Sequence, residues 1–184
     1  MAIIEHISIG WLNGWWFTVV FGLTNFYFLV KYHNHRRFSK RLFRFPPFDS
    51  KFKKVISMIS VILFMRGMMI YTIFVTVDIG TAWFYIGLII YLVGLAFYIE
   101  ALKSFSKTKE DKPVVTGVYR LSRHPMQIFS LIMWVGVGMA TANWIILLIC
   151  GIQPFLVYYF LKCQERFCLE QYGEEYQVYL QKTP

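Results

Sequence analysis

Four long apolar stretches with almost no charge dominate this sequence. Residues 11–30, 79–99 and 126–161 contain no Asp, Glu, Lys or Arg, and residues 55–77 contain a single charge, Arg66. A helix needs roughly 20 apolar residues to cross the hydrocarbon core of a bilayer. The last run is too long for one crossing, so we interpret it as two helices and predict five transmembrane helices in all. None of the runs shows the strict alternation of a membrane β-barrel, so the expected fold class is an all-α polytopic membrane protein.

The longest run should form a tight helical hairpin, because the polar turn 141–143 (Thr-Ala-Asn) interrupts it. We expect the first arm near Gln127–Ala140 and the second near Trp144–Cys163. The first arm is short for a full crossing, so it would need helical partners or locally thinned lipid. The run 11–30 is longer than the core of a cleavable signal peptide, and we expect it to remain as a span.

The composition excludes the common soluble classes. Hydrophobic residues make up 57% of the 184 residues and charged residues only 16%, against about a quarter in soluble domains. A soluble chain of this size could not bury so much apolar surface, and the same excess excludes a disordered chain. The three cysteines have neither the number for a disulfide scaffold nor the spacing of a zinc site, so we expect no metal.

The basic residues predict the orientation. Of the 19 Lys and Arg, all but Arg66 fall in segments 31–54, 102–125 and 162–184, which five spans would place on one face. By the positive-inside rule this face is cytoplasmic, so we expect the N-terminus outside and the C-terminus inside. The net charge of +9 then reflects topology and attraction to anionic membrane lipids, and no nucleic-acid partner is expected.

We expect a single membrane domain over residues 1–184, divided into two functional parts. Residues 1–100 would supply three spans and the basic cytoplasmic loop 31–54. Residues 101–184 would supply a loop, the hairpin and a C-terminal cytoplasmic helix. The cytoplasmic segments at the two ends of the hairpin would meet if the hairpin closes, and they are the main room for chemistry on the cytoplasmic side.

The strongest candidate cluster lies just before the hairpin. Residues 117–125 read Gly-Val-Tyr-Arg-Leu-Ser-Arg-His-Pro. Pro125 suits a first helical turn, which puts Arg123 and His124 at a helix N-terminus, where free N–H groups and the helix dipole favour an anion. A plain juxtamembrane basic anchor is the alternative, but it would need neither the histidine nor the Gly-x-Tyr turn.

Glu165 is the second candidate, because it follows the long uncharged run near the expected end of the last span. A helix C-terminus disfavours negative charge, so the carboxylate should have a partner. A basic residue of segment 102–125, a cationic ligand and the neighbouring Lys162 all remain possible partners. Three tyrosines that follow should share one helical face and pack rather than react, namely Tyr172, Tyr176 and Tyr179.

Two features inside the spans also need an interpretation. Arg66 is costly at mid-membrane; it could pair with Glu100 or Asp78 or line a substrate cavity, and we favour a structural role. Gly136 and Gly138 have no strand before them, so they favour close helix packing over dinucleotide binding.

Together the two clusters resemble the integral-membrane isoprenylcysteine carboxyl methyltransferase family, whose broader superfamily includes phospholipid N-methyltransferases. The resemblance covers about residues 100–184, and it implies that residues 101–184 form the catalytic, cofactor-binding region, with a cytoplasmic active site and cofactor pocket. Its motif residues are Gly117, Tyr119, Arg123, His124, Pro125, Glu165, Tyr172, Gly173, Tyr176 and Tyr179. The chain departs from the family at Gln127, where a tyrosine is usual, and at Arg166, unless the family's Glu pair aligns with Gln164 and Glu165.

The resemblance implies S-adenosylmethionine as methyl donor, S-adenosylhomocysteine as product, and a lipophilic acceptor such as the carboxylate of a prenylated cysteine. The donor-binding residues that it implies are Lys112, Pro113, Val114, Tyr119, His124, Pro125, Met126, Gln127 and Glu165.

The catalytic candidates are Arg120, Arg123 and Glu165. Either arginine could hold an anionic acceptor or the donor's carboxylate, and Glu165 could hold the donor's ammonium or ribose hydroxyls. A carboxylate acceptor is already ionised at neutral pH, so the site needs alignment more than a general base. Lys162 is the nearest candidate for the basic residue that the family places against the substrate carboxylate.

Three alternatives stay open. A phospholipid or another lipophilic N- or S-methyltransferase of the same superfamily would carry the same motifs. Nicotinamide-dependent membrane reductases of the sterol type share much of the pattern but are generally longer. A non-enzymatic subunit or transporter would be expected to place more polar residues at mid-membrane.

Overall fold

The computed structural model describes residues 10–32, 51–109 and 111–183, and most of the basic loop 31–54 lies outside them. Over the described ranges the chain is helical and contains no β-strand, which confirms the all-α prediction. Its elements are α1 (Trp15–Lys31), α3 (Lys51–Ile62), η1 (Leu63–Gly67), α4 (Met68–Tyr71), α5 (Ala82–Lys107), η2 (Gly117–Arg120), α6 (Pro125–Ala140), α7 (Trp144–Tyr172) and α8 (Glu174–Lys182).

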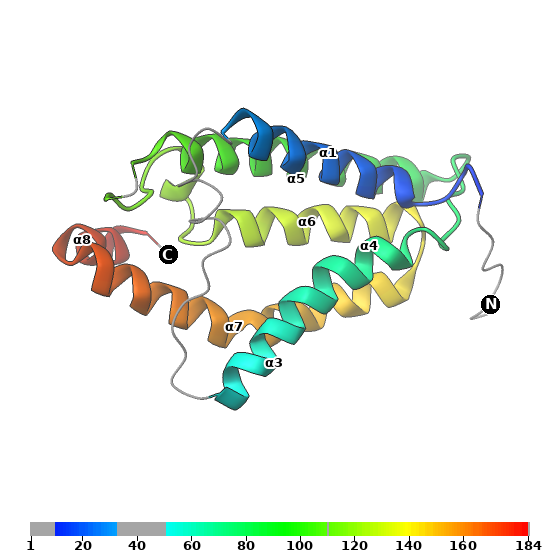
Figure 1. The fold of residues 1–184 in the computed structure, drawn as a ribbon. Helices are drawn as coiled ribbons and strands as arrows, with labels where there is room; N and C mark the ends of the chain where they lie inside the picture. The colour runs from blue at the N-terminus through cyan, green and yellow to red at the C-terminus, as the bar shows by residue number, and fades with distance from the viewer. Residues whose placement is uncertain (1–9, 33–50, 110, 184) are drawn as a thin grey trace.

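The long helices form an elongated bundle with two distinct ends (Figure 1). At one end, which we call the turn end, lie the start of α1, the end of α4 and the turn between α6 and α7. At the other, the α8 end, α8 lies beside the loop that precedes α6. Two helices, α5 and α7, are long and apolar enough to cross a membrane, and α6 and the stretch Ser57–Tyr71 are apolar but shorter.

The turn end is held by caps and by one short extended pairing. Asn143 accepts hydrogen bonds from the N–H groups of Ile145 and Ile146, which fixes the start of α7 directly after the predicted polar turn. Asn13 bridges to Thr76, so the residues before α1 are tied to those after α4. The predicted apolar run 55–77 is therefore not one helix throughout, because its helix ends at Tyr71.

Helices α5 and α6 pack with their backbones nearly in contact. A Cβ atom added to Gly136 would lie 2.5 Å from the backbone nitrogen of Tyr91, and one added to Gly87 would collide with the backbone nitrogen of Ala140. Small residues at a helix interface permit this close approach. The prediction that Gly136 serves close packing is confirmed. The pair forms the rigid centre of the bundle, and the Tyr91 hydroxyl ties it to α1 through the Phe17 carbonyl oxygen at 2.6 Å.

The predicted hairpin is present, but its second arm is longer than expected. Helix α6 ends at Ala140 as predicted, whereas α7 continues past Cys163 to Tyr172. Glu165 therefore lies inside a helix and not at its C-terminus. The expectation that Glu165 needs a partner because it lies at a helix C-terminus is thus wrong in its premise. The helix ends at Gly173, whose φ of 57° is the left-handed region that glycine tolerates, and α8 begins directly after it.

Candidate active site

The loop between α5 and α6 is folded tightly against α5. Its turn η2 starts at Gly117, where φ is +63° and a side chain would collide with the Ser104 side chain. Val118 and Tyr119 are buried against Ala101 of α5. This packing fixes the direction in which the loop enters α6.

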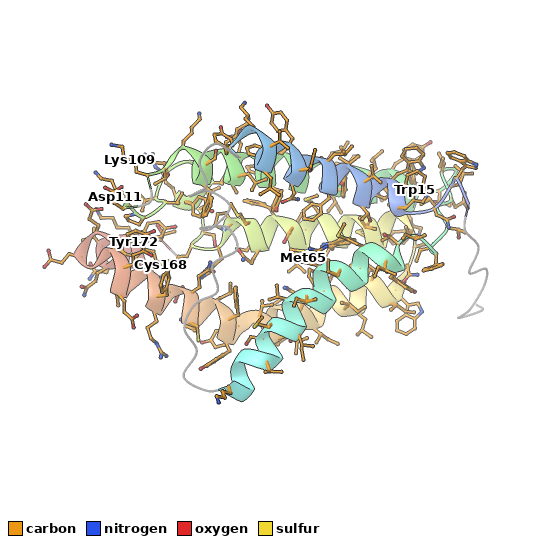
Figure 2. All side chains as sticks on the ribbon, in the orientation of Figure 1. Trp15, Met65, Lys109, Asp111, Cys168 and Tyr172 are labelled. Atoms are coloured by element: carbon orange, nitrogen blue, oxygen red, sulfur yellow. The ribbon has the colours of Figure 1, made fainter. Side chains whose placement is uncertain are left out.

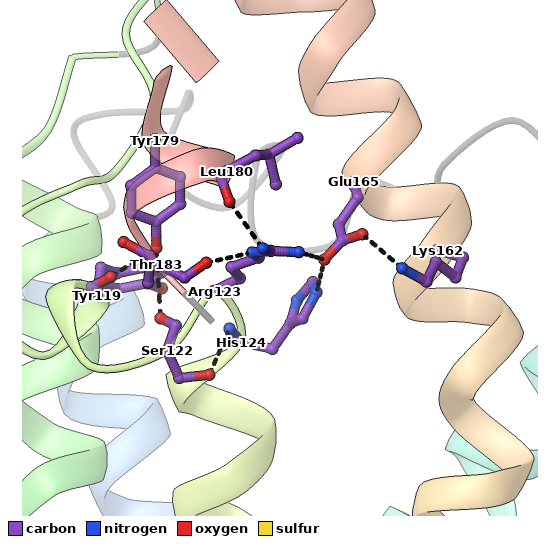
Figure 3. Close-up of polar contacts among 9 residues, drawn as sticks. All are labelled: Tyr119, Ser122, Arg123, His124, Lys162, Glu165, Tyr179, Leu180 and Thr183. Carbon is purple, nitrogen blue, oxygen red and sulfur yellow. Dashed lines mark hydrogen bonds and ion pairs between the residues drawn. The ribbon is translucent and has the colours of Figure 1, made fainter. Parts of the chain in front are cut away.

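Helix α6 begins as the sequence predicts, with Pro125 in its first turn and His124 as the N-cap residue. The missing N–H of proline costs nothing at this position. Arg123 and His124 are consequently held at the helix N-terminus, where their side chains point toward α7 and α8 (Figure 3).

Arg123 connects the loop to the C-terminal helix. Its Nε donates to the carbonyl oxygen of Thr183 and its Nη2 to that of Leu180, both at 2.7 Å. These carbonyls lie at the end of α8, where the last C=O groups of a helix lack partners within it. The planar guanidinium thus holds the end of α8 against the loop. Its third nitrogen, Nη1, lies 3.4 Å from Oε1 of Glu165.

Glu165 is surrounded by basic side chains (Figure 3). Its Oε1 lies 3.3 Å from Nε2 of His124 and 3.4 Å from Nη1 of Arg123, and its Oε2 lies 3.3 Å from Nζ of Lys162. Two of the partners proposed from sequence, a basic residue of segment 102–125 and Lys162, are thus present together. The hydrogen bond from His124, assisted by Lys162, lowers the pKa of the Glu165 carboxyl from 4.5 to about 2.

The lowered pKa predicts a specific loss of stability in acid. The ionised Glu165 stabilises the folded chain above about pH 4.5, and this contribution is lost as the pH falls toward 2. We expect the difference in thermal midpoint between the native protein and Glu165→Gln, measured in detergent, to be constant above pH 4.5 and to shrink below it. A difference that does not change with pH would contradict this origin of the stability.

Two buried tyrosines of α8 complete the closure. The Tyr179 hydroxyl donates to the Tyr119 carbonyl oxygen at 2.6 Å, with the Ser122 carbonyl oxygen 3.3 Å away. Burial raises the pKa of Tyr179 to about 12, so the hydroxyl keeps the proton that it donates. Burial also raises the pKa of Tyr176. Tyr172 ends α7 while the other two lie on α8, so the three tyrosines do not share one continuous helix face as predicted.

A cavity of about 180 Å³ lies between the loop, the start of α6, the second half of α7 and α8. Gln164 is one of its lining residues, and the buried Oε1 of this side chain has no hydrogen-bond partner among the described residues. A buried acceptor without a partner is costly, so a donor group brought close to it would stabilise the site. The cavity is lined by Phe105, Pro113, Val114, Tyr119, Arg123, His124, Pro125, Met126, Gln127, Gln164, Phe167, Cys168, Gln171, Tyr172, Tyr176 and Tyr179.

The structure brings most of the candidate residues to this cavity. Of the donor-binding residues implied by the resemblance, only Lys112 and Glu165 do not line it. Lys112 is exposed on the loop, and Glu165 contacts the cavity indirectly through Arg123 and His124. Of the two arginines proposed for catalysis, Arg123 lines the cavity and Arg120 is exposed outside it.

Sequence reasoning missed the face of α7 that lines the cavity. Gln164, Phe167, Cys168 and Gln171 all face it, with the spacing of one helix face. The spacing of these residues in the sequence indicates one helix face, but only if the helix is expected to continue beyond Cys163.

No group of three or more His, Cys, Asp or Glu side chains in the described ranges is placed to hold a metal ion. The three cysteines there form no disulfide: Cys150 and Cys163 are buried and Cys168 is half-buried.

Comparison with known proteins identifies the family. The family model described as phospholipid methyltransferase matches residues 75–175, which include α5, the loop, α6, all of α7 and the first residues of α8. No curated protein and no solved structure matches the chain. The match covers more than half of the sequence and contains the Arg123–His124–Glu165 cluster at the cavity. The chain belongs to the phospholipid methyltransferase family, which places it among the membrane methyltransferases.

Proposed function

We propose that this chain transfers a methyl group from S-adenosylmethionine to a lipophilic acceptor at the α8 end of the bundle. The observation that carries the proposal is the cavity itself: the family match spans its loop, its α6 wall and its α7 wall, and the cavity is lined by Arg123, His124 and Gln164. When bound, the donor supplies a methyl group already activated by its sulfonium.

The residues of the cavity fit the polar groups of such a donor. Arg123 and His124 can hold its carboxylate, and Oε1 of Gln164 can accept from its ammonium or its adenine amine. Tyr119, Phe167 and Tyr172 supply aromatic walls suited to the adenine ring. The volume of about 180 Å³ is below the range of roughly 300–1,000 Å³ usual for small-molecule sites, so binding of the whole donor would require the cavity to widen.

The proposed topology has five membrane crossings, formed by α1, the α3–α4 segment, α5, α6 and α7. The basic segments 102–125 and 162–184 meet at the α8 end, which supports a cytoplasmic position for that end. A polar donor would enter from the cytoplasm, and a lipophilic acceptor would enter sideways from the bilayer.

Glu165 acts in this proposal as a positioning residue. It does not line the cavity, and its charge is already neutralised by Arg123, His124 and Lys162. By holding Arg123 and His124 it sets the geometry of the two basic side chains that face the donor. Arg120 and Lys112 are exposed beside the site, where they could meet the acceptor or the open edge of the donor.

The electrostatics favour an anionic acceptor such as the carboxylate of a prenylated cysteine. The cluster has an excess of positive charge, and Lys162 is half exposed beside it. An amine acceptor would have to lose a proton, and Glu165, with a pKa of about 2, is a weak base. The family match favours the second candidate, a phospholipid amine.

Calorimetry with S-adenosylhomocysteine on the detergent-solubilised protein tests the donor assignment. We expect micromolar binding that weakens about tenfold in Glu165→Gln, because Arg123 and His124 lose their anionic partner. Glu100→Gln is the matched control, since Glu100 is an exposed carboxylate paired with Lys103 on α5. No binding by protein whose helicity is intact, or displacement by NADPH, would contradict the methyltransferase assignment.

The acceptor is identified by transfer of a radiolabelled methyl group to N-acetyl-farnesylcysteine and to phosphatidylethanolamine in parallel. We expect methylation of the farnesylated carboxylate, released as methanol by base. Label found only in the phospholipid would replace the prenylcysteine proposal with the phospholipid one.

A further inference from the structure

A second and larger cavity lies at the turn end of the bundle. It has a volume of about 730 Å³ and is formed by the start of α1 and by the η1–α4 segment. We call it the Arg66 groove. Its walls are Gly10, Trp11, Trp15, Thr18, Val19, Arg66, Met69, Ile70 and Ile73.

The Arg66 groove is separate from the methyltransferase cavity. None of its wall residues belongs to that cavity. In Figure 2, Trp15 of the groove lies at the turn end, while Tyr172 and Cys168 of the other cavity lie at the α8 end. The family match begins at residue 75, after the last wall residue of the groove, so the proposed methyl transfer does not account for it.

Arg66 is the charged group in a wall that is otherwise mostly apolar. It lies in η1, a single π-helical turn inside the α3–α4 segment. Such turns are frequent at functional sites because the extra residue shifts the side chains that follow. The partners considered from sequence are engaged elsewhere: Glu100 pairs with Lys103, and Asp78 accepts from the Gly80 N–H. Within the described ranges, Arg66 has no ion pair.

Two other polar side chains of the groove are already hydrogen-bonded. The Thr18 hydroxyl is hydrogen-bonded to that of Thr72 at 2.7 Å, and Nε1 of Trp15 donates to the Gly10 carbonyl oxygen at 3.2 Å. The charge in the groove is therefore that of one guanidinium, and most of the remaining wall offers apolar surface. A ligand that complements it has one anionic group and a hydrocarbon part.

The depth of Arg66 suits a lipid head group. It precedes the end of α4 at Tyr71 by five residues, or about 8 Å of helix. An arginine side chain can reach from that depth to the membrane interface. Trp11 and Trp15 line the same groove at the turn end, and tryptophan is the residue enriched at head-group level.

We propose that the Arg66 groove binds one anionic phospholipid, with its phosphate on Arg66 and one acyl chain against Val19, Met69 and Ile73. The proposal rests on the membrane topology given under Proposed function but not on the methyl-transfer reaction. The walls favour a lipid over free phosphate because a free anion would leave the apolar surface uncovered. An anionic lipid suits an unpaired guanidinium better than a zwitterionic lipid, whose own cation competes for the phosphate.

Native mass spectrometry of the delipidated protein in detergent tests this inference, with phosphatidylglycerol and phosphatidylcholine of identical chains as probes. We expect the protein to retain one phosphatidylglycerol molecule tightly and to bind phosphatidylcholine more weakly. In Arg66→Gln, the affinity for phosphatidylglycerol should fall about tenfold. Lys107→Gln is the control, because it removes one exposed positive charge from the far end of α5. Arg66→Lys should restore most of the binding.

A second variant tests the acyl-chain half of the groove without touching the charge. Val19→Trp fills the wall, and we expect it to lose long-chain phosphatidylglycerol as Arg66→Gln does. Equal losses in Arg66→Gln and Lys107→Gln, or equal binding of the two lipids, would overturn the proposal and leave Arg66 as a side chain that only reaches for the interface. S-adenosylhomocysteine calorimetry on the same samples separates the two proposals, since the Arg66 variants should bind it normally.

Discussion

Replacing Arg123 with lysine is expected to release α8 and to weaken S-adenosylhomocysteine binding by about 100-fold. The guanidinium donates to the carbonyls of Leu180 and Thr183 while it contacts Glu165, and a single ammonium cannot span these three positions. Hydrogen bonds from a charged donor contribute roughly 1.5–3 kcal/mol each, so losing one or two costs the affinity stated. Calorimetry measures the affinity, and hydrogen exchange of the α8 amides measures the release.

Lys182→Gln is the matched control for this variant. It also removes a basic residue at the α8 end, but Lys182 is exposed and does not line the cavity. We expect native affinity and native exchange protection. If Arg123→Lys binds like the native protein while α8 exchanges faster, then α8 is not needed to close the cavity. If neither the affinity nor the exchange protection changes, the contacts of Arg123 contribute neither to ligand binding nor to the stability of α8.

Replacing Gly87 with alanine is expected to have the largest effect on folding, although the position has no chemical role. The added methyl group would collide with the backbone of Ala140, so α5 and α6 would have to move apart along their whole contact. Overpacking of this kind costs about 1–3 kcal/mol, and more when backbone atoms must shift. We expect a thermal midpoint well below that of the native protein, measured by circular dichroism in detergent.

Gly22→Ala controls for the intrinsic effect of the substitution. Gly22 lies inside α1 with open space around it, so an added methyl group meets nothing within 4 Å. Alanine is favoured over glycine in a helix by about 1 kcal/mol, so this variant should be as stable as the native protein or more so. Equal destabilisation by both changes would show that the loss at Gly87 is not steric.

Much of the fold was predictable because its signals are local. The uncharged runs, the polar turn at 141–143 and Pro125 each act within a few residues, and they predict the helical hairpin and the start of α6 correctly. The end of α7 was not predictable in this way. The apolar run stops at Leu161, but the helix continues because its next turns pack polar and aromatic side chains around the cavity.

The site was predictable in its residue types but not in its contacts. Arg123, His124 and Glu165 stand out by residue type beside apolar runs, and the fold brings both basic side chains within 3.4 Å of Glu165. Arg123 donates hydrogen bonds to two carbonyl oxygens near the end of α8. The choice of these carbonyls depends on the direction of α8, which changes from that of α7 at Gly173. Gln164 gives no signal on its own, because an unsatisfied amide is visible only after its surroundings are folded.

The contacts of Arg123 with residues 180 and 183 also have a consequence for shortened chains. Both residues follow the last apolar run in the sequence, so the segments that form the hairpin do not include them. A chain that stopped before Leu180 would keep α6 and α7 but would lack both carbonyl groups that Arg123 holds. The hairpin and the contacts that close its α8 end can thus be separated by truncation.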